Sequence, residues 1–291
     1  MTCSVLSEAI QAAFVAACEA ELAAPKPGNV HFFAGGHGMA AEDFIASARA
    51  AAPFIAAPDA QVGDRILGAV EATWAAVGQN TNLGIVLLCA PLAAAALAAF
   101  SSESGLRAAL VAVLAGLDVA DADAAFRAIR LARPAGLGDA PTHDVAAAAQ
   151  TTLREAMRVA AARDRIAFQY DNAFIDVFDV GGAALAAARA RGADAADETL
   201  AVYLAFLSAF PDSHVARKYG ARVAAALCEE ARAFRAGVAG VDATARFAAA
   251  LAWDAQLKTR RLNPGTSADL TVATLFTDRL AAILASDCKN G

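Results

Sequence analysis

Long apolar blocks rich in alanine, leucine and valine alternate along this chain with short polar breaks that contain glycine and proline. No run of alternating β-branched and polar residues bounded by turn residues occurs, so the pattern gives no strand signal. Alanine is the best helix former, and its small side chain lets helices pack closely. The blocks predict helices at about residues 4–22, 41–56, 60–77, 82–99, 104–116, 121–132, 145–169, 173–191, 195–209, 214–236, 241–260 and 267–286.

This pattern continues from end to end without a linker or a change in composition. Of the 291 residues, 58% are apolar, which is enough to bury a large core. We therefore expect an all-α fold: a single domain over residues 1–291 of about a dozen helices, with the site at helix ends and loops. Helix N-termini carry free N–H groups and the positive end of the dipole, so several together suit a phosphate-bearing ligand.

Charge, hydropathy and cysteine content indicate which partners and which cellular compartment to expect. The net charge of −6 comes without a basic tract, so we expect no nucleic-acid partner. Residues Leu83–Phe100 are uncharged, but Pro91 interrupts them and no basic segment flanks them, so we expect a buried central helix and no membrane span. Five scattered cysteines without a CxxC pair, and an N-terminus without a basic signal segment, predict a cytoplasmic protein.

The break PKPGNVH, after the first predicted helix, contains two prolines and one lysine. One histidine ends it and a second follows six residues later. Prolines on both sides of Lys26 fix where its ammonium points, and Gly28 allows a turn or the close approach of a ligand. His31 and His37 follow as proton donors, metal ligands or phosphate contacts. The alternative is an ordinary helix stop, because proline commonly follows a helix. We favour a ligand-binding loop.

A second break, GQNTNLG, places Asn80, Thr81 and Asn82 directly before the most apolar predicted helix. Asparagine and threonine are good N-caps because their oxygens accept from free N–H groups. One cap needs one such residue, so three in a row indicate a ligand-facing turn.

The segment PAGLGDAPTHD holds Asp139 and Asp144. Their carboxylates suit a divalent cation or a general base, although Asp144 also suits the cap of the next helix. The His-Asp pair in this segment, with His37 before it and Asp212 or Asp269 after it, weakly imitates the His…His-Asp…Asp order of the HD phosphohydrolases. A metal-dependent phosphohydrolase is therefore one alternative.

The segment FPDSHVARK starts a predicted helix with two cations in its first turn. Capping by Asp212 or Ser213 is ordinary, but Arg217 and Lys218 oppose the helix dipole there. A bound anion would relieve this conflict, which makes the two cations candidate phosphate contacts. A salt bridge to nearby carboxylates is the competing interpretation.

The last break, RLNPGTSADL, has Asn263 before the final predicted helix and Ser267 and Asp269 in its opening turn. A well-capped helix explains Ser267 and Asp269 without a ligand. Alone, this segment decides nothing.

Together the segments resemble the triphosphoribosyl-dephospho-CoA synthase family. The matching stretches are PKPGNVHFFAGGHGM, GQNTNLG, GLGDA, PDSHVARK and NPGTSADL, which occur in the same order from about Glu21 to Phe276. The resemblance implies an all-helical transferase that uses ATP and 3′-dephospho-CoA. Such an enzyme joins the ribose C1 of ATP to the 2′-hydroxyl of dephospho-CoA, keeps the triphosphate and releases adenine.

The chain also departs from the synthases of the citrate lyase pathway. Those carry Asp at His31, and they have His-Lys at Asn82-Leu83. PKPGNVH and NTNLG look more like a divergent branch from archaea and methylotrophic bacteria. The resemblance to that branch implies another cofactor precursor as acceptor, such as one of methanopterin or methanofuran biosynthesis.

The resemblance and the residues together give a set of expected roles. Catalytic duties are expected for His31, His37, Asp139, Asp144 and His214. Nucleotide binding is expected for Lys26, Gly28, Asn29, Asn80, Thr81, Asn82, Ser213, Arg217, Lys218, Asn263 and Ser267. Magnesium (Mg²⁺), with ATP as substrate, is expected at Asp139, Asp212 and Asp269. A non-catalytic nucleotide-binding protein is a further alternative, and assembly into a homo-oligomer stays open.

Overall fold

The structure is a computed structural model that describes residues 2–36, 38–102, 105–134, 145 and 147–287. These residues form fourteen α-helices and one π-helical segment and no β-strand, which confirms the all-α prediction. The helices are α1 (Cys3–Leu22), α2 (Ala41–Ile55), α3 (Val62–Val77), α4 (Leu83–Ser102), α5 (Leu106–Ala115), α6 (Val119–Ala132), α7 (Leu153–Ala160), α8 (Arg165–Asp171), η1 (Asp176–Gly181), α9 (Gly182–Ala190), α10 (Ala195–Ala209), α11 (Ser213–Tyr219), α12 (Ala221–Gly237), α13 (Ala243–Thr259) and α14 (Gly265–Asp287).

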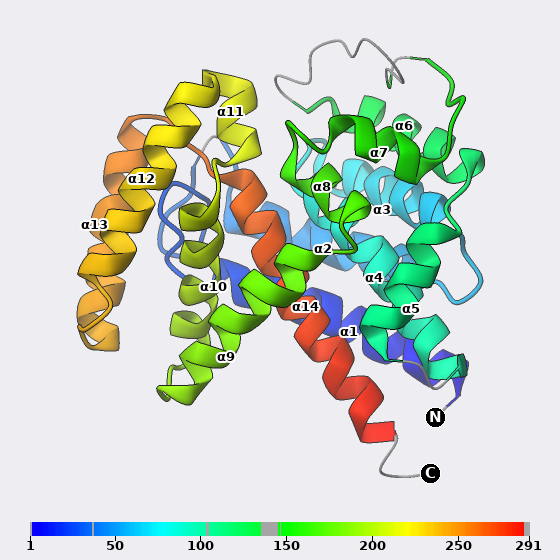
Figure 1. The fold of residues 1–291 in the computed structure, drawn as a ribbon, viewed down its shortest axis with the longest axis horizontal. Helices are drawn as coiled ribbons and strands as arrows, with labels where there is room; N and C mark the ends of the chain where they lie inside the picture. Colours follow the sequence, from blue (N-terminus) through cyan, green and yellow to red (C-terminus); the bar gives the residue numbers. More distant parts are fainter. Residues whose placement is uncertain (1, 37, 103–104, 135–144, 146, 288–291) are drawn as a thin grey trace.

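Helices α4 and α14 form the centre of the molecule. They pack against each other, α4 also packs on α3 and α5, and α14 also packs on α1 and α10. Figure 1 shows α14 running diagonally between α10–α13 on one side and α3–α8 on the other. Phe276 of α14 is fully buried and meets the ring of Phe14 of α1 edge-on at 5.7 Å. These contacts join the end of the chain to its beginning.

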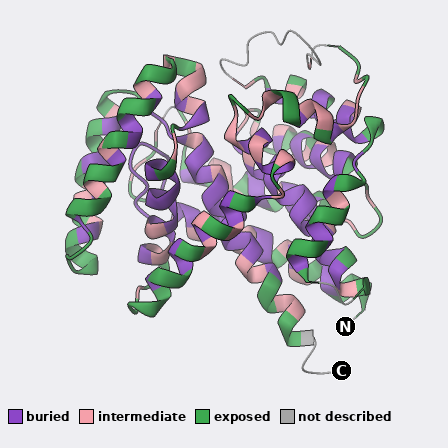
Figure 2. Ribbon diagram, viewed as in Figure 1, coloured by how far each residue is buried: buried purple, intermediate pink, exposed green. Residues whose placement is uncertain are grey.

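Most of the apolar core lies in a large and a smaller cluster. The large cluster is built mainly on α1–α6 and α14, and the smaller one on α10–α13. In Figure 2 the buried positions follow the inner faces of the helices, while α12 and α13 expose their outer faces. The polar loops between the two clusters are thereby held against packed helices.

The segment predicted as a buried central helix is α4. Among the described residues, α1 and α4 are long and apolar enough to cross a membrane by length and composition alone. However, 78% of the apolar window of α4 is buried inside the protein, and one or two such helices are weak evidence for a membrane. Helix α4 is apolar on all sides because other helices surround it.

Three predicted helices differ from the helices in the structure. The prediction of a continuous helix at 145–169 is wrong, because α7 ends at Ala160 and Asp164 caps a new helix by accepting from Ile166 N at 2.9 Å and Ala167 N at 3.2 Å. The helix predicted at 214–236 is broken at Gly220, whose φ of 92° is unavailable to a helix. The helix predicted at 173–191 begins with the π-helical segment η1.

Truncation of Phe276 tests the position of α14 at the centre. We expect Phe276→Ala to lower the free energy of unfolding by about 3–5 kcal/mol, because it removes buried apolar surface and leaves a cavity. Urea denaturation followed by circular dichroism measures this change. Val111→Ala is the control, since Val111 is 50% exposed and its loss should cost well under ~1 kcal/mol. Equal losses for the two variants would contradict this fold.

Candidate active site

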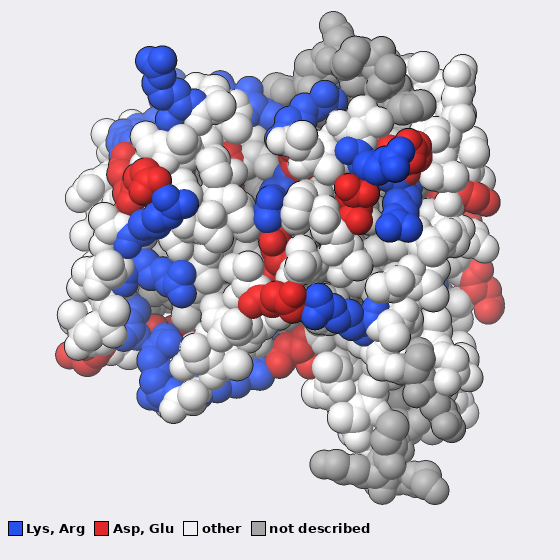
Figure 3. Space-filling view, viewed as in Figure 1, with Lys and Arg blue, Asp and Glu red and all other residues white. Residues whose placement is uncertain are grey.

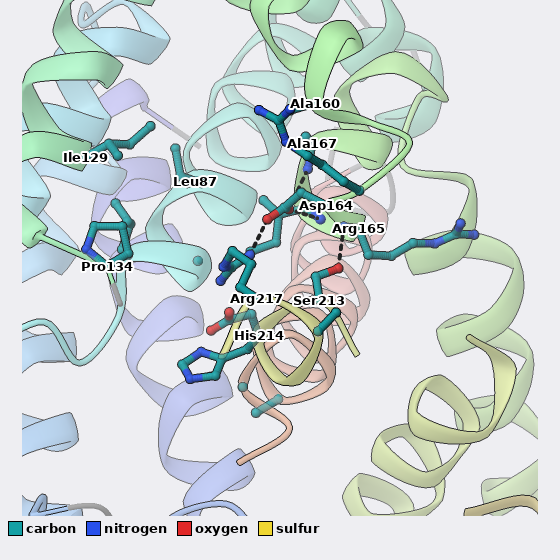
Figure 4. A pocket seen from close by; sticks show the side chains of 18 of the residues that line it. Leu87, Ile129, Pro134, Ala160, Asp164, Arg165, Ala167, Ser213, His214 and Arg217 are labelled. Carbon is teal, nitrogen blue, oxygen red and sulfur yellow. Dashed lines mark hydrogen bonds and ion pairs between the residues drawn. The ribbon is translucent and has the colours of Figure 1, made fainter. Parts of the chain in front are cut away.

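Most of the predicted site segments meet at one cleft of about 1160 Å³. It is lined by the N-terminal ends of α4, α8, α11 and α14, by the end of α6 and by α7. Figure 4 shows Leu87, Ile129 and Pro134 on one side of this cavity, with Asp164, His214 and Arg217 on the other. The cleft therefore has an apolar wall and a charged wall.

The first and last loops of the chain close one end of the cleft together. Asn29 Nδ2 donates to Asn263 Oδ1 at 2.8 Å, and both residues line the cleft. Gly28 has a φ of 86°, and a Cβ there would lie 2.8 Å from the carbonyl oxygen of Leu262. Only glycine fits this position without strain. The hydroxyl of Tyr203 also donates to the carbonyl of Pro27 at 2.7 Å.

Lys26 lies behind the cleft wall instead of facing a ligand. Its side chain is fully buried, and its ammonium pairs with Glu21 and donates to Asn29 Oδ1 at 3.1 Å and to the carbonyl of Val30 at 2.7 Å. Burial lowers the pKa of Lys26 and raises the pKa of Glu21, while the opposite charge of each partner counteracts the shift. Glu21 lines the cleft. Lys26 therefore pairs with an acidic residue of the cleft. Its ammonium does not point into the cleft, contrary to the prediction that it contacts a phosphate.

His31 is likewise directed away from the cleft. It is 1% exposed, and its Nε2 lies 3.3 Å from Oδ2 of Asp254 on α13. Burial lowers the pKa of His31, which favours the neutral ring. The predicted proton transfer by His31 would need a ligand to reach a ring that the protein covers.

Of the three residues Asn80, Thr81 and Asn82, the first caps a helix and the other two bond to neighbouring helices. Asn80 Oδ1 accepts from Leu83 N at 3.2 Å, which is the single cap that α4 requires. The hydroxyl of Thr81 lies 2.6 Å from that of Ser47, and Asn82 Nδ2 donates to the hydroxyl of Thr73 at 2.9 Å. All three of Asn80, Thr81 and Asn82 line the cleft. Thr81 and Asn82 are therefore fixed by α2 and α3 at the cleft edge, and contact with a ligand stays a prediction.

Helix α11 contributes His214, Arg217 and Lys218 to the cleft, and its start is held by several hydrogen bonds. Asp212 caps it by accepting from Val215 N at 3.1 Å, and its other oxygen accepts from the amide and hydroxyl of Ser267, each at 2.8 Å. Ser213 Oγ accepts from Arg165 N at 2.8 Å. The backbone N–H of His214 donates to Thr266 Oγ1 at 3.2 Å. Since both carboxylate oxygens of Asp212 are used, Asp212 and Ser267 support the cleft from behind.

The prediction that Arg217 and Lys218 lie in a first turn is wrong, because α11 ends at Tyr219 and both lie in its last turn, where the helix dipole favours cations. Their surroundings differ. Arg217 forms an ion pair with Asp164, the cap of α8, as the competing interpretation allowed. Its Nε is buried and has no hydrogen-bond partner in the part of the chain that the structure describes. Lys218 is exposed, lines the cleft and has no ion pair among the described residues. Both therefore retain donors for an anion.

Asp269, in the first turn of α14, presents a carboxyl group to the cleft. It has no hydrogen bond or ion pair with any other described residue. Burial holds its pKa well above the usual range, and the carboxylates of Asp212 and Glu21 add to the shift, while Arg217 opposes it. A Cβ at Gly84 would lie 2.5 Å from Asp269 Cγ. Glycine at position 84 therefore makes the room that this carboxyl group occupies beside the start of α4.

Two further cations at the cleft that have no ion pair among the described residues escaped the sequence analysis. Arg133 ends α6, and Arg163 lies in the turn between α7 and α8. Both are exposed, both line the cleft, and neither has an ion pair within the described ranges. Arg163 stood inside a segment predicted as continuous helix, so only the break at Asp164 shows that it belongs to the site.

Part of the predicted metal and catalytic set cannot be placed. His37, Asp139 and Asp144 lie outside the described residues. Among the described residues, no group of three or more His, Cys, Asp or Glu side chains is arranged to hold a metal ion. On the face in Figure 3, basic and acidic side chains are interspersed and do not form one basic patch.

Comparison with known proteins identifies the family. No curated protein and no solved structure matches the chain. Residues 7–287 match the family CitG, described as ATP:dephospho-CoA triphosphoribosyl transferase, which covers nearly the whole chain. The fold, the cleft and this match agree with the resemblance seen in the sequence motifs. The chain belongs to the CitG family of triphosphoribosyl transferases.

Proposed function

We propose that the cleft is the active site, where the triphosphoribosyl group of ATP passes to dephospho-CoA and adenine leaves. The observation that carries this proposal is the placement of opposite charges in one cleft. Asp269 and the paired Glu21 line its acidic part, while Arg163, Arg217 and Lys218 line its cationic part. A triphosphate needs the cations, and a ribose that becomes positively charged at C1 needs nearby anionic groups.

The reaction breaks one bond and forms one. The bond between ribose C1 and adenine breaks, and its electron pair leaves with adenine, which takes up a proton. The 2′-hydroxyl oxygen of dephospho-CoA forms the new bond to C1 and loses its proton. Asp269 is a cleft-lining titratable group suited to one of these proton transfers, because Asp164 and Glu21 are already engaged in ion pairs. His214 is a second titratable group that lines the cleft.

The triphosphate would bind between α8 and α11. The unpartnered Nε of Arg217 supports this placement, because buried donors are rarely left without an acceptor. The free charges of Lys218 and Arg163 lie on the same cleft. Arg163 lies just before the start of α8, and Arg217 and Lys218 lie in the last turn of α11. Three cations on one cleft suit a ligand with several negative charges.

Magnesium is proposed as a companion of the triphosphate and not as a resident of a preformed site. Mg²⁺ is usually held by one or two carboxylates together with substrate phosphates and waters. Asp269 fits this requirement, because its carboxyl group faces the cleft without a partner among the described residues. The ion would supply charge neutralisation to the phosphates.

The cleft also has room for the acceptor. Its volume of about 1160 Å³ exceeds the roughly 300–1,000 Å³ typical of a pocket for one small ligand. The apolar wall, with Leu87, Phe126 and Ile129, suits the aliphatic arm of dephospho-CoA. The same volume would admit another cofactor precursor, as expected for the divergent branch.

Release of adenine is the direct test of this function. The protein is incubated with ATP, magnesium and dephospho-CoA, and the products are separated by chromatography and weighed by mass spectrometry. We expect free adenine and dephospho-CoA that has gained a triphosphoribosyl group, in equal amounts. Phosphate without adenine would indicate a hydrolase instead. Neither product, with ATP bound, would indicate a binding protein or a different acceptor.

Gly84→Ala tests the role of the Asp269 carboxyl group. The added methyl group would displace this carboxyl group from its place beside α4, so we expect kcat for adenine release to fall about a hundredfold or more. Gly116→Ala is the matched control, because a Cβ at Gly116 meets its nearest atoms at 3.6 Å, an ordinary contact. An unchanged kcat in a folded Gly84→Ala protein would remove Asp269 from the mechanism.

Lys218→Ala tests the cationic part of the cleft. The loss of one exposed phosphate contact should cost about 1 kcal/mol, which raises the KM for ATP roughly fivefold and leaves the fold intact. Arg222→Ala is the control, since Arg222 is exposed on α12 and does not line the cleft. Equal effects of both variants would mean that general surface charge, and not this site, attracts the nucleotide.

A further inference from the structure

A buried carboxylate outside the cleft fastens the loop that closes its end. Asp254 of α13 is 3% exposed and does not line the cleft. Its Oδ1 accepts from Gly28 N at 2.8 Å, and its Oδ2 accepts from Lys258 Nζ at 2.9 Å and lies 3.3 Å from His31 Nε2. Lys258 Nζ also donates to the carbonyl of Ala34 at 3.0 Å. Asp254 thus contacts Gly28 and His31 directly and reaches Ala34 through Lys258.

These contacts are strong enough to keep the carboxylate charged. Burial alone would raise the pKa of Asp254, but the nearby His31 ring and the hydrogen bonds from Lys258 and the Gly28 amide together outweigh it and lower this pKa below the usual value. Charged groups inside a protein are tolerated when several donors satisfy them. The arrangement therefore acts as a fixed clamp on the loop.

The clamp reaches the cleft through the residues beside Gly28. Asn29 is the next residue and lines the cleft, where its amide is bonded to Asn263. Lys26 lies two residues before Gly28 and holds Glu21, another cleft residue. A shift of the Gly28 backbone would move Asn29 directly and Glu21 through Lys26. A displacement of about 1 Å in a catalytic site is enough to lower activity.

We propose that Asp254 is a positioning residue of this enzyme, which acts on the reaction through the loop at residues 26–34. Asp254 touches no substrate; it sets the place of Asn29 and, through Lys26, of Glu21. This inference rests on the proposed function of the cleft. It also explains why a histidine and a lysine far apart in the sequence share one carboxylate beside a loop rich in proline and glycine.

The chain offers a matched control for a merely structural role. Asp197 of α10 is 8% exposed, and its Oδ2 forms ion pairs with Arg246 and Arg191. It belongs to the same half of the molecule as Asp254 but does not line the cleft or contact the loop. Its loss should therefore destabilise the protein without moving the cleft residues.

The experiment compares the full-length variants Asp254→Ala, Asp254→Asn and Asp197→Ala with the unaltered protein. Hydrogen exchange at residues 26–34 reports the loop, titration with ATP reports binding, and adenine release reports turnover. We expect Asp254→Ala to speed exchange in the loop and to lower kcat/KM by at least about tenfold. Asp254→Asn keeps an oxygen for the Gly28 amide, so it should fold and recover part of both losses. Asp197→Ala should lower the melting temperature but leave loop exchange and kcat/KM within about twofold.

The proposal is overturned if loop exchange stays unchanged in both Asp254 variants, or if it rises while ATP binding and kcat/KM do not change. It is also overturned if Asp197→Ala impairs the loop and turnover equally. Absence of adenine from the unaltered protein is a failure of the proposed function instead. In that case loop exchange and ATP binding still decide whether Asp254 positions the cleft.

Discussion

Polar groups that a helical protein removes from water must find partners inside it, and at this cleft the partners come from segments far apart in the chain. Asn29 is satisfied by Asn263, and Asp212 is satisfied by Ser267. Each bond requires loops that are more than fifty residues apart in sequence to stay in contact. The same bonds that stabilise the closed fold therefore also set the geometry of the site.

Helix ends line the cleft because the helix middles are mostly buried in the apolar core. Helix α4 is buried on nearly every side, and the polar residues Asn80 and Asn82 lie at its start. Small residues bring such starts close together. Gly84 allows the first turn of α14 to place Asp269 directly against the first turn of α4. Two helix starts can share one carboxyl group only where one of them lacks a side chain.

The sequence allowed the fold class, most helix bounds and the position of the breaks to be predicted, because helix propensity and capping are local properties. The sequence did not reveal which residues of a break face the cleft and which support the packing behind it. Lys26 was expected to face a phosphate, yet the acid that it satisfies is Glu21, five residues earlier on the preceding helix. Only the packing of the loop shows which way the ammonium points.

Residues that act at long range were the least visible in the sequence. Asp254 stands in an ordinary helical segment, and nothing in its neighbourhood indicates that its partner is an amide at Gly28. Arg163 was hidden by a helix prediction that overlooked Asp164 as a cap. Such residues depend on contacts between segments, which a pattern of local preferences does not encode.

The distribution of charge bears on which bond of ATP reacts. An enzyme that transfers a phosphoryl group needs cations around the phosphorus that is attacked. Here the cations Arg163, Arg217 and Lys218 lie near α8 and α11, while Asp269 lies at the start of α14 near other carboxylates. A positive charge that develops at ribose C1 beside Asp269 would favour its ionised form, so stabilisation grows as the glycosidic bond breaks. The triphosphate, held by the cations, would stay intact, which is the outcome that the family's transfer reaction requires.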